Sequence, residues 1–205
     1  MVAIIDYGMG NIGSIYNMIR KIGENSIVRA VDPEELYEAD KIILPGVGAY
    51  DMAVTMLKKR GFWNVVQEMA LHKKKPLLGI CLGMQLLGMA SEEGNEKGLG
   101  LIPFRCKRFC FEDVRLKVPH MGWDYVSVKK ETCPLTEALS EESRFYFVHS
   151  YFAVCDNSED ILMTCRYGNE FVAAVHKNNV YGTQFHPEKS HRFGMDLLRN
   201  FVKRC

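Results

Sequence analysis

The strongest constraint on the fold is an alternation of short apolar segments with amphipathic segments over the first 90 residues. Strands are expected at 2–6, 26–31, 41–44 and 76–80, and helices at 11–22, 49–59, 62–72 and 82–90, with a further short helix opening at 32–33. Parallel strands need a crossover connection between them, and a helix is the usual one. The pattern therefore predicts an α/β fold with a parallel sheet covered by helices on both faces.

The second half of the chain changes to a series of short strands. They are expected at 104–109, 125–128, 145–154, 161–166, 171–176 and 180–185, followed by a helix at 191–203. Lys177-Asn178-Asn179 suits a hairpin turn between the last two strands. We therefore expect antiparallel or mixed strands added to the parallel sheet, within one domain spanning residues 1–205.

Charge and cysteine usage exclude several classes of protein. The formal net charge is +1, so nothing indicates binding to nucleic acid or to an anionic membrane. The N-terminus does not resemble a signal peptide, and no apolar run approaches the roughly 20 residues that span a bilayer. Seven irregularly spaced cysteines predict thiols in a reducing compartment, and Cys106 and Cys110 lack the spacing of a zinc site. These features predict a cytoplasmic location and no metal.

One glycine-rich turn has the pattern of a dinucleotide-binding fold. Gly8 to Gly13 matches G-x-G-x-x-G between a strand and a helix, and Asp32 ends the next strand. Backbone N–H groups at the start of a helix attract phosphate, which favours a dinucleotide-binding module. The same glycines also suit a tight turn without a ligand. The choice depends on whether other residues offer a more specific chemistry.

Cys81 lies within Gly79-Ile80-Cys81-Leu82-Gly83, between an expected strand and helix. This is the pattern of a nucleophile elbow, whose glycines permit a strained turn that presents the side chain at the edge of the sheet. The start of a helix stabilises a thiolate, and the backbone N–H of Leu82 would face an oxyanion formed by attack of Cys81. A buried structural cysteine would suit the same segment.

A base for this cysteine is offered near the C-terminus. In an extended chain, side chains two residues apart point the same way, so His186 and Glu188 can share a face. Pro187 between them has a fixed φ and stiffens the pair. A surface His-Pro-Glu turn is the alternative, but an elbow cysteine upstream favours a Cys81–His186–Glu188 triad.

Taken together, these motifs resemble those of the class I, or triad, glutamine amidotransferases. The resemblance extends over almost the whole chain, through the segments IIDYGMGN (4–11), LPGVGAY (44–50), GICLGMQLL (79–87), KGLGLIP (97–103), PHMGW (119–123), FYFVHSY (145–151) and GTQFHPEKS (182–190). It implies an open, flavodoxin-like central sheet, hydrolysis of glutamine through a γ-glutamyl thioester, and no cofactor.

The resemblance also implies roles for further residues. A loop of Gly46, Val47 and Gly48 would supply a second oxyanion donor, and His149, Ser150 and Tyr151 would hold the amino-acid end of glutamine. Gln85 lies one helical turn after Cys81, so it is expected to face the same pocket. An exposed helical glutamine is the alternative for Gln85.

A partner is implied as well: a (β/α)8-barrel synthase subunit that receives ammonia and forms imidazole glycerol phosphate in histidine biosynthesis. Residues 119–123 suit a docking loop, because Met and Trp are common interface anchors. The expected interface residues are Asn11, His120, Met121, Trp123 and Lys189. Trp123 would also suit a core position.

Two rival functions use the same elbow. One is a paralogous glutaminase subunit that supplies ammonia for amidination of a surface sugar, and residues 104–123 depart from the usual histidine-pathway segment. The other is a cysteine hydrolase acting on peptides or γ-glutamyl chains.

Overall fold

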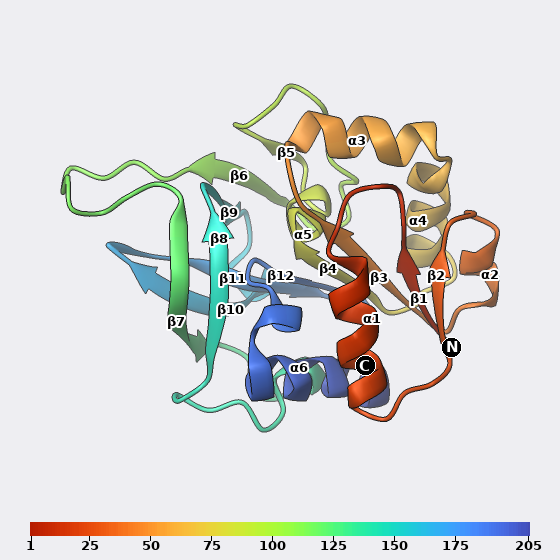
Figure 1. The fold of residues 1–205 in the computed structure, drawn as a ribbon. Coiled ribbons are helices and arrows are strands. Elements are labelled where there is room, and N and C mark those ends of the chain that lie inside the picture. The colour runs from red at the N-terminus through yellow and green to blue at the C-terminus, as the bar shows by residue number, and fades with distance from the viewer.

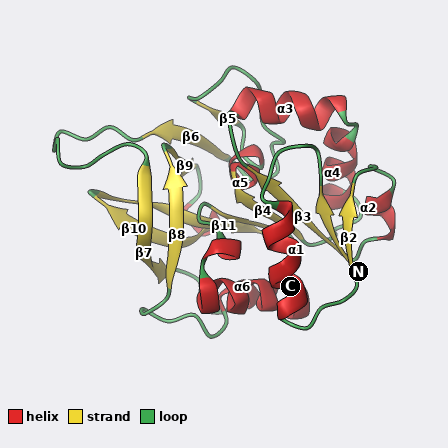
Figure 2. Ribbon diagram, viewed as in Figure 1, coloured by secondary structure: helices red, strands yellow, loops and turns green.

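The computed structural model describes residues 1–205, which form a mixed sheet of twelve strands with helices on both sides (Figures 1 and 2). The main path through the sheet has the order β2-β1-β3-β4-β12-β11-β10-β7-β8. The strands are β1 Val2–Ile5, β2 Ile27–Ala30, β3 Lys41–Gly46, β4 Leu77–Cys81, β5 Ala90–Ser91, β6 Phe104–Arg108, β7 His120–Val128, β8 Arg144–His149, β9 Tyr151–Cys155, β10 Ile161–Tyr167, β11 Asn169–Lys177 and β12 Val180–Thr183. The first five strands in the path are parallel and the others are antiparallel, which confirms the predicted fold class.

The helices lie in two layers that bury the two faces of the parallel strands. They are α1 Ile12–Lys21, α2 Glu35–Glu38, α3 Tyr50–Lys59, α4 Phe62–Leu71, α5 Leu82–Leu86 and α6 His191–Arg204. Alternate residues of β1 enter different cores: Ala3 and Ile5 pack with α2, α3 and α4, whereas Val2 and Ile4 pack with α1 and α6. Because both faces of the strand are buried, the strand is apolar throughout.

Helix α5 is much shorter than the helix expected at 82–90. It ends at Leu86, and the chain soon enters the short strand β5. The backbone of Gly88 lies against the ring of Phe104, since a Cβ there would be 2.7 Å from Phe104 Cδ2. Close packing against β6 therefore replaces the last turns of the expected helix.

The second half of the chain contains two further departures from the sequence prediction. The strand expected at 145–154 is two strands, β8 and β9, separated at Ser150. Strand β7 begins at His120 instead of at residue 125, so most of the expected docking loop is part of a β7–β8 ladder. The hairpin turn at residues 177–179 is confirmed, with Asn178 at a φ of 55°.

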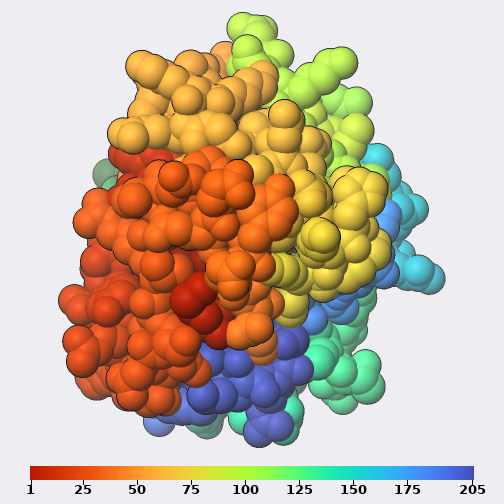
Figure 3. Space-filling model, turned by 90° about the vertical axis from the view of Figure 1, so that its right-hand side faces the viewer, coloured from red at the N-terminus to blue at the C-terminus, as the bar shows by residue number.

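The C-terminal helix α6 packs beside α1, and in Figure 3 the blue C-terminal residues border the red and orange N-terminal ones. Lys41 Nζ donates hydrogen bonds to the carbonyl oxygens of Phe201, Val202 and Cys205 at 3.0, 2.8 and 2.6 Å. A cation at these carbonyls stabilises the negative end of the helix dipole. No helix of the structure is both long enough and apolar enough to cross a membrane.

Candidate active site

Three neighbouring parallel strands place the candidate catalytic residues at one edge of the sheet. Strand β4 lies between β3 and β12, and Cys81 at the end of β4 is in register with Gly46 at the end of β3. On the other side, Thr183 of β12 is in register with Ile80, so the chain reaches His186 soon after the same edge. Carboxyl ends of parallel strands are a common location for active sites in open α/β sheets.

The backbone at Cys81 has the strained conformation of an elbow. Its φ is 55° and its ψ is −111°, a region that non-glycine residues rarely occupy. The flanking glycines allow α5 to lie directly against the sheet: a Cβ at Gly79 would lie 2.8 Å from Met84 Cα, and one at Gly83 would lie 2.9 Å from the carbonyl carbon of Leu44. The elbow geometry is therefore present, with both glycines required by packing.

His186 and Glu188 form a buried pair, although not in the way that the sequence suggested. His186 Nδ1 lies 2.8 Å from Glu188 Oε1, and the side chains are 2% and 1% exposed. The expected extended segment is wrong, because residues 187–189 form a 3-10 turn, η3. The hydroxyl of Ser190 donates a hydrogen bond of 2.6 Å to the carbonyl oxygen of His186 and helps to hold this turn.

Helix α6 approaches the turn closely enough to require a glycine. A Cβ at Gly194 would lie 2.7 Å from the carbonyl carbon of Pro187. This contact fixes the turn that carries Glu188 against the first turns of α6. Nothing in the sequence motif alone indicates the role of Gly194.

The electrostatics favour a protonated His186 imidazole. Burial alone would lower the pKa of His186, but hydrogen bonds to Cys81 and Glu188, together with their negative charges, raise the pKa to about 10. A cationic imidazole beside Cys81 is the form that stabilises a thiolate nucleophile. The site therefore has the charge arrangement of a cysteine–histidine pair oriented by a carboxylate.

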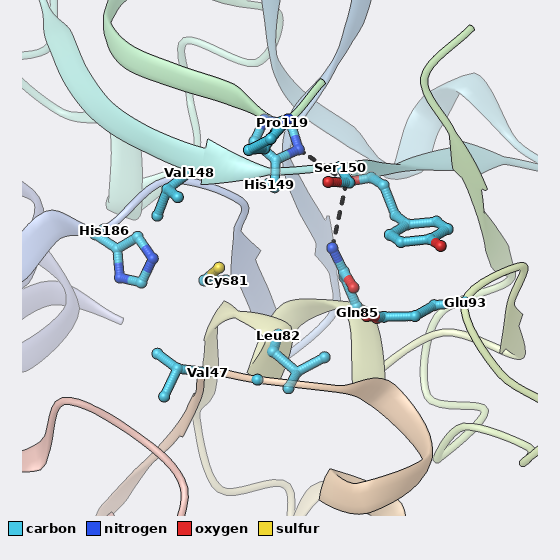
Figure 4. A pocket seen from close by; sticks show the side chains of 12 residues that line it. Val47, Cys81, Leu82, Gln85, Glu93, Pro119, Val148, His149, Ser150 and His186 are labelled. Atoms are coloured by element: carbon cyan, nitrogen blue, oxygen red, sulfur yellow. Dashed lines mark hydrogen bonds between the residues drawn. The ribbon is translucent and has the colours of Figure 1, made fainter. Parts of the chain in front are cut away.

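Cys81 and His186 open into a pocket of about 330 Å³ (Figure 4). In Figure 4 their side chains face a common space, and Glu93 lies on the opposite side beyond Gln85. The lining residues are Val47, Gly48, Cys81, Leu82, Gln85, Glu93, Pro119, Val148, His149, Ser150, Tyr151 and His186. The structure thus brings together all the expected triad and glutamine-binding positions except Glu188, which lies behind His186.

Gln85 points into this pocket as its helical spacing predicts. Its amide nitrogen donates to the carbonyl oxygen of Tyr151 at 3.3 Å and to Gln184 Oε1 at 3.1 Å. Gln184 is fully buried, and its own amide nitrogen lies 3.8 Å from Cys81 Sγ. Sequence reasoning did not identify Gln184, although its position two residues before His186 was a usable signal. A buried amide network therefore connects the cysteine to the far side of the pocket.

The expected oxyanion loop lies beside the nucleophile. Val47 and Gly48 line the pocket with Leu82, while Gly46 belongs to β3 and not to the loop. Gly46 needs to be a glycine for packing, since a Cβ there would lie 2.6 Å from the backbone nitrogen of Gly83. Gly48 has a φ of 100°, a conformation that favours glycine.

Side chains along β7 alternate between its two faces, so the expected interface residues on this strand do not all face the same way. Met121 and Trp123 are exposed, at 62% and 39%, and Tyr125, which the sequence did not single out, continues the same face at 58%. The expectation that the His120 side chain faces a partner is wrong, because it points to the opposite face and is 1% exposed.

The two remaining interface candidates lie near the triad. Lys189 is exposed in η3, and its ammonium lies 5.6 Å from the ring centre of Tyr146. Asn11 is half-buried, and its amide nitrogen lies 3.4 Å from Glu188 Oε1. Asn11 is thus positioned between the triad and the surface.

The glycine-rich turn at residues 8–13 is explained by packing. Gly8 and Gly10 have φ values of 92° and 148°, and a Cβ at Gly10 would lie 2.9 Å from side-chain atoms of Pro45. The turn therefore brings the start of α1 close to the end of β3, which precedes Val47 and Gly48. No group of three or more His, Cys, Asp and Glu side chains is placed to hold a metal ion, and all seven cysteines are free.

Comparison with known proteins gives a family for nearly the whole chain. The family model described as glutamine amidotransferase class-I matches residues 3–205. Imidazole glycerol phosphate synthase subunit HisH 2 of Methanococcus maripaludis is 53% identical, over 100% of both chains. The subunit of the same name from Pseudomonas aeruginosa is 50% identical, over 99% of both chains. Subunit HisH of Leptospira borgpetersenii is 42% identical, over 98% of this chain and 99% of that relative.

Solved structures share the fold at low sequence identity. The structure of PurLQS from Thermotoga maritima gives a TM-score of 0.74 at 20% identity, covering 98% of this chain and 96% of that one. The glutaminase domain of Trypanosoma brucei CTPS with bound acivicin gives 0.65 at 16% identity, covering 100% and 94%. These likenesses concern the fold alone.

Proposed function

Because the chain belongs to the class I glutamine amidotransferase family, we propose that it is the glutaminase subunit of imidazole glycerol phosphate synthase, which acts in histidine biosynthesis. The observation that carries the catalytic part is the convergence of Cys81, His186 and Glu188 at one sheet edge. Relatives that bear the synthase name match the chain from end to end. We also propose that residues 1–205 form one domain, because β12 lies between β4 and β11 in a single sheet.

The proposed reaction begins with nucleophilic attack. The Cys81 thiolate attacks the side-chain amide carbon of glutamine, while Glu188 orients the protonated imidazole of His186. The backbone N–H of Leu82 and one backbone N–H of Val47 or Gly48 bind the tetrahedral oxyanion. His186 then donates its proton to the leaving nitrogen, and ammonia departs. The remaining γ-glutamyl thioester is hydrolysed by a water molecule whose proton passes to His186, and this step releases glutamate.

The pocket also has groups suited to the amino-acid end of the substrate. Glu93 lies across the pocket from Cys81, where its carboxylate would pair with the α-ammonium group. Ser150 and Tyr151 lie at the break between β8 and β9 and line the pocket, where their backbone N–H groups would donate hydrogen bonds to the α-carboxylate. Gln85 holds this segment through the Tyr151 carbonyl.

A barrel subunit is the proposed recipient of the ammonia. The exposed apolar side chains of Met121, Trp123 and Tyr125 form a continuous face on β7, and aromatic residues and Met are enriched in protein interfaces. Lys189 and Asn11 lie on the side of the triad and would complete the contact. We infer a cytoplasmic location, because free cysteines persist in a reducing compartment.

A mass measurement tests the catalytic assignment. The chain with its barrel partner is incubated with a diazoketone analogue of glutamine, and the intact mass is recorded. We expect one adduct on the wild-type chain and on Cys106→Ala, which removes a buried thiol away from the pocket, and none on Cys81→Ala. An adduct that persists in Cys81→Ala contradicts the assignment.

Growth tests the pathway. Expression of the chain should restore histidine-independent growth to a strain that lacks its own glutaminase subunit. A well-expressed chain that fails to restore growth, but still forms the Cys81 adduct, would move the proposal to the sugar-amidination pathway.

A further inference from the structure

A row of hydrogen bonds connects the glutamine pocket to the surface of β7. His149 Nδ1 lies 2.8 Å from the carbonyl oxygen of Tyr151, His149 Nε2 lies 3.0 Å from His120 Nδ1, and His120 Nε2 lies 2.7 Å from Asp124 Oδ2. The side chains of His120 and His149 are buried, at 1% and 6% exposed, while the Asp124 side chain is 36% exposed. Nothing in the triad mechanism uses these three side chains as a unit.

This row needs one more proton than two neutral histidines carry. The Tyr151 carbonyl and the ionised Asp124 carboxylate both accept hydrogen bonds, so each of the three contacts requires its own proton. Two neutral imidazoles supply two protons. With only two protons in the row, one of the three contacts has an acceptor on both sides. The charged carboxylate of Asp124 retains the N–H donor of His120, because a hydrogen bond to a charged acceptor is the stronger one. The contact that fails is then the one between the histidines, which leaves a buried nitrogen of His149 unsatisfied.

We propose that His120 and Asp124 are positioning residues for glutamine binding, and that a titratable proton on His120 sets the placement of the His149–Tyr151 segment. The proposal rests on the proposed function, since it assigns that segment to the glutamine pocket. With the proton bound, His149 is held from both ring nitrogens and the Tyr151 carbonyl is held by it. Without the proton, His149 loses one of its two anchors, and glutamine binds more weakly.

The surroundings supply no alternative proton donor. The ring of Tyr167 stacks on His120 with 4.1 Å between centres, but its hydroxyl donates to the carbonyl oxygen of Lys117. Phe109, Phe147 and Phe171 pack around the two histidines and have no polar atom in their side chains. Cys165 lies near Asp124, and burial followed by that charge raises its pKa to about 12, so it remains a neutral thiol.

The direction of the pH dependence follows from burial. Burial lowers the pKa of His149 to about 3. The hydrogen bond to the Tyr151 carbonyl opposes this shift, and the charges of His120 and His186 add to it, so His149 is neutral and the extra proton belongs to His120. Burial also lowers the pKa of His120, although the hydrogen bond and charge of Asp124 oppose this. The proton is therefore bound in acid and released as the pH rises towards neutral.

Substitution of Asp124 by asparagine supplies the third hydrogen bond of the row without a titratable proton. The amide nitrogen of an asparagine donates a hydrogen bond at every pH, so Asp124→Asn should complete the row with two neutral histidines. For the complex with the barrel subunit, we expect the wild-type KM for glutamine to rise about three- to tenfold from pH 5.5 to pH 8, the size expected for one buried hydrogen bond. Asp124→Asn should keep the low KM throughout and bind glutamine better than wild type at pH 8.

Two controls and one spectroscopic measurement complete the test. Asp196→Asn, an exposed position on α6, should behave as wild type, and His120→Phe should show a raised KM that is independent of pH. An Asp124→Asn variant that retains the wild-type pH dependence, or a folded His120→Phe variant with an unchanged KM, would overturn the proposal. Side-chain ¹⁵N shifts of the histidines report the proton without catalysis: His120 should titrate in wild type and not in Asp124→Asn. That readout remains valid if the chain proves not to hydrolyse glutamine.

Discussion

Substitution of Gly83 by alanine tests whether packing at the elbow sets the catalytic geometry. The added Cβ would overlap the carbonyl oxygen of Leu44 and lie 2.9 Å from its carbonyl carbon and 3.1 Å from that of Pro45. These are backbone atoms of β3, so no side-chain rotation relieves the contact. Helix α5 and β3 must move apart by about 1 Å, which carries Leu82 away from Val47 and Gly48. A misplacement of that size can cost about 100-fold in rate.

The expected result has two parts. Overpacking of a rigid core costs about 1–3 kcal/mol, which corresponds to a fall in Tm of roughly 2–12 °C for a chain of this size. Glutaminase kcat in the complex should fall about 100-fold, while Gly13→Ala, where a Cβ meets nothing within 4 Å, should leave kcat unchanged. Thermal unfolding and ammonia release measure the two effects. Wild-type kcat in a folded Gly83→Ala variant would refute the reasoning.

Two other predictions concern stability. Lys41→Met removes three hydrogen bonds to the end of α6 and should lower the free energy of unfolding by about 1–2 kcal/mol in urea titrations. Lys59→Met, at an exposed position, should change the free energy of unfolding by less than about 0.5 kcal/mol. Equal effects of the two substitutions would contradict the capping role of Lys41. The pKa of His186 is raised from 6.5 to about 10 on folding, so its stabilising contribution is complete below pH 6.5 and is lost as the pH rises through 10. Glu188→Gln should flatten this loss, and parallel curves for the two proteins would contradict the assignment.

The sequence was sufficient to predict the parallel sheet and the convergence of Cys81, His186 and Glu188, because both follow from local patterns. Alternating apolar segments fix a parallel sheet, and the edge of that sheet brings residues after β4 and β12 together regardless of their separation in the chain. The pairing of His186 with Glu188 was predicted from an extended segment and occurs in a 3-10 turn. The pairing of the two side chains was predicted correctly although the backbone conformation was not, because residues two apart can make this contact in an extended segment and in a 3-10 turn.

Features that depend on tertiary packing were not accessible from the sequence. The end of α5 is set by Phe104, a residue of β6, and the burial of His120 is set by the side on which β7 meets its neighbours. Gln184 had the right alternation relative to His186, but only the structure shows its amide beside Cys81. A shift of one residue in the pairing register of a strand moves all its side chains to the opposite face, and the composition of β7 does not reveal its register.

The position of β12 in the sheet has a consequence for the synthesis of the protein. This strand is the last in the chain, yet it is inserted between β4 and β11, and it leads directly to His186. A chain still emerging from the ribosome therefore has a complete elbow but no base for its cysteine, and it exposes two unpaired strand edges that β12 will later join. The Cys81–His186 pair of the proposed glutaminase can therefore form only after β12 has joined the sheet and residues up to Glu188 have folded onto it.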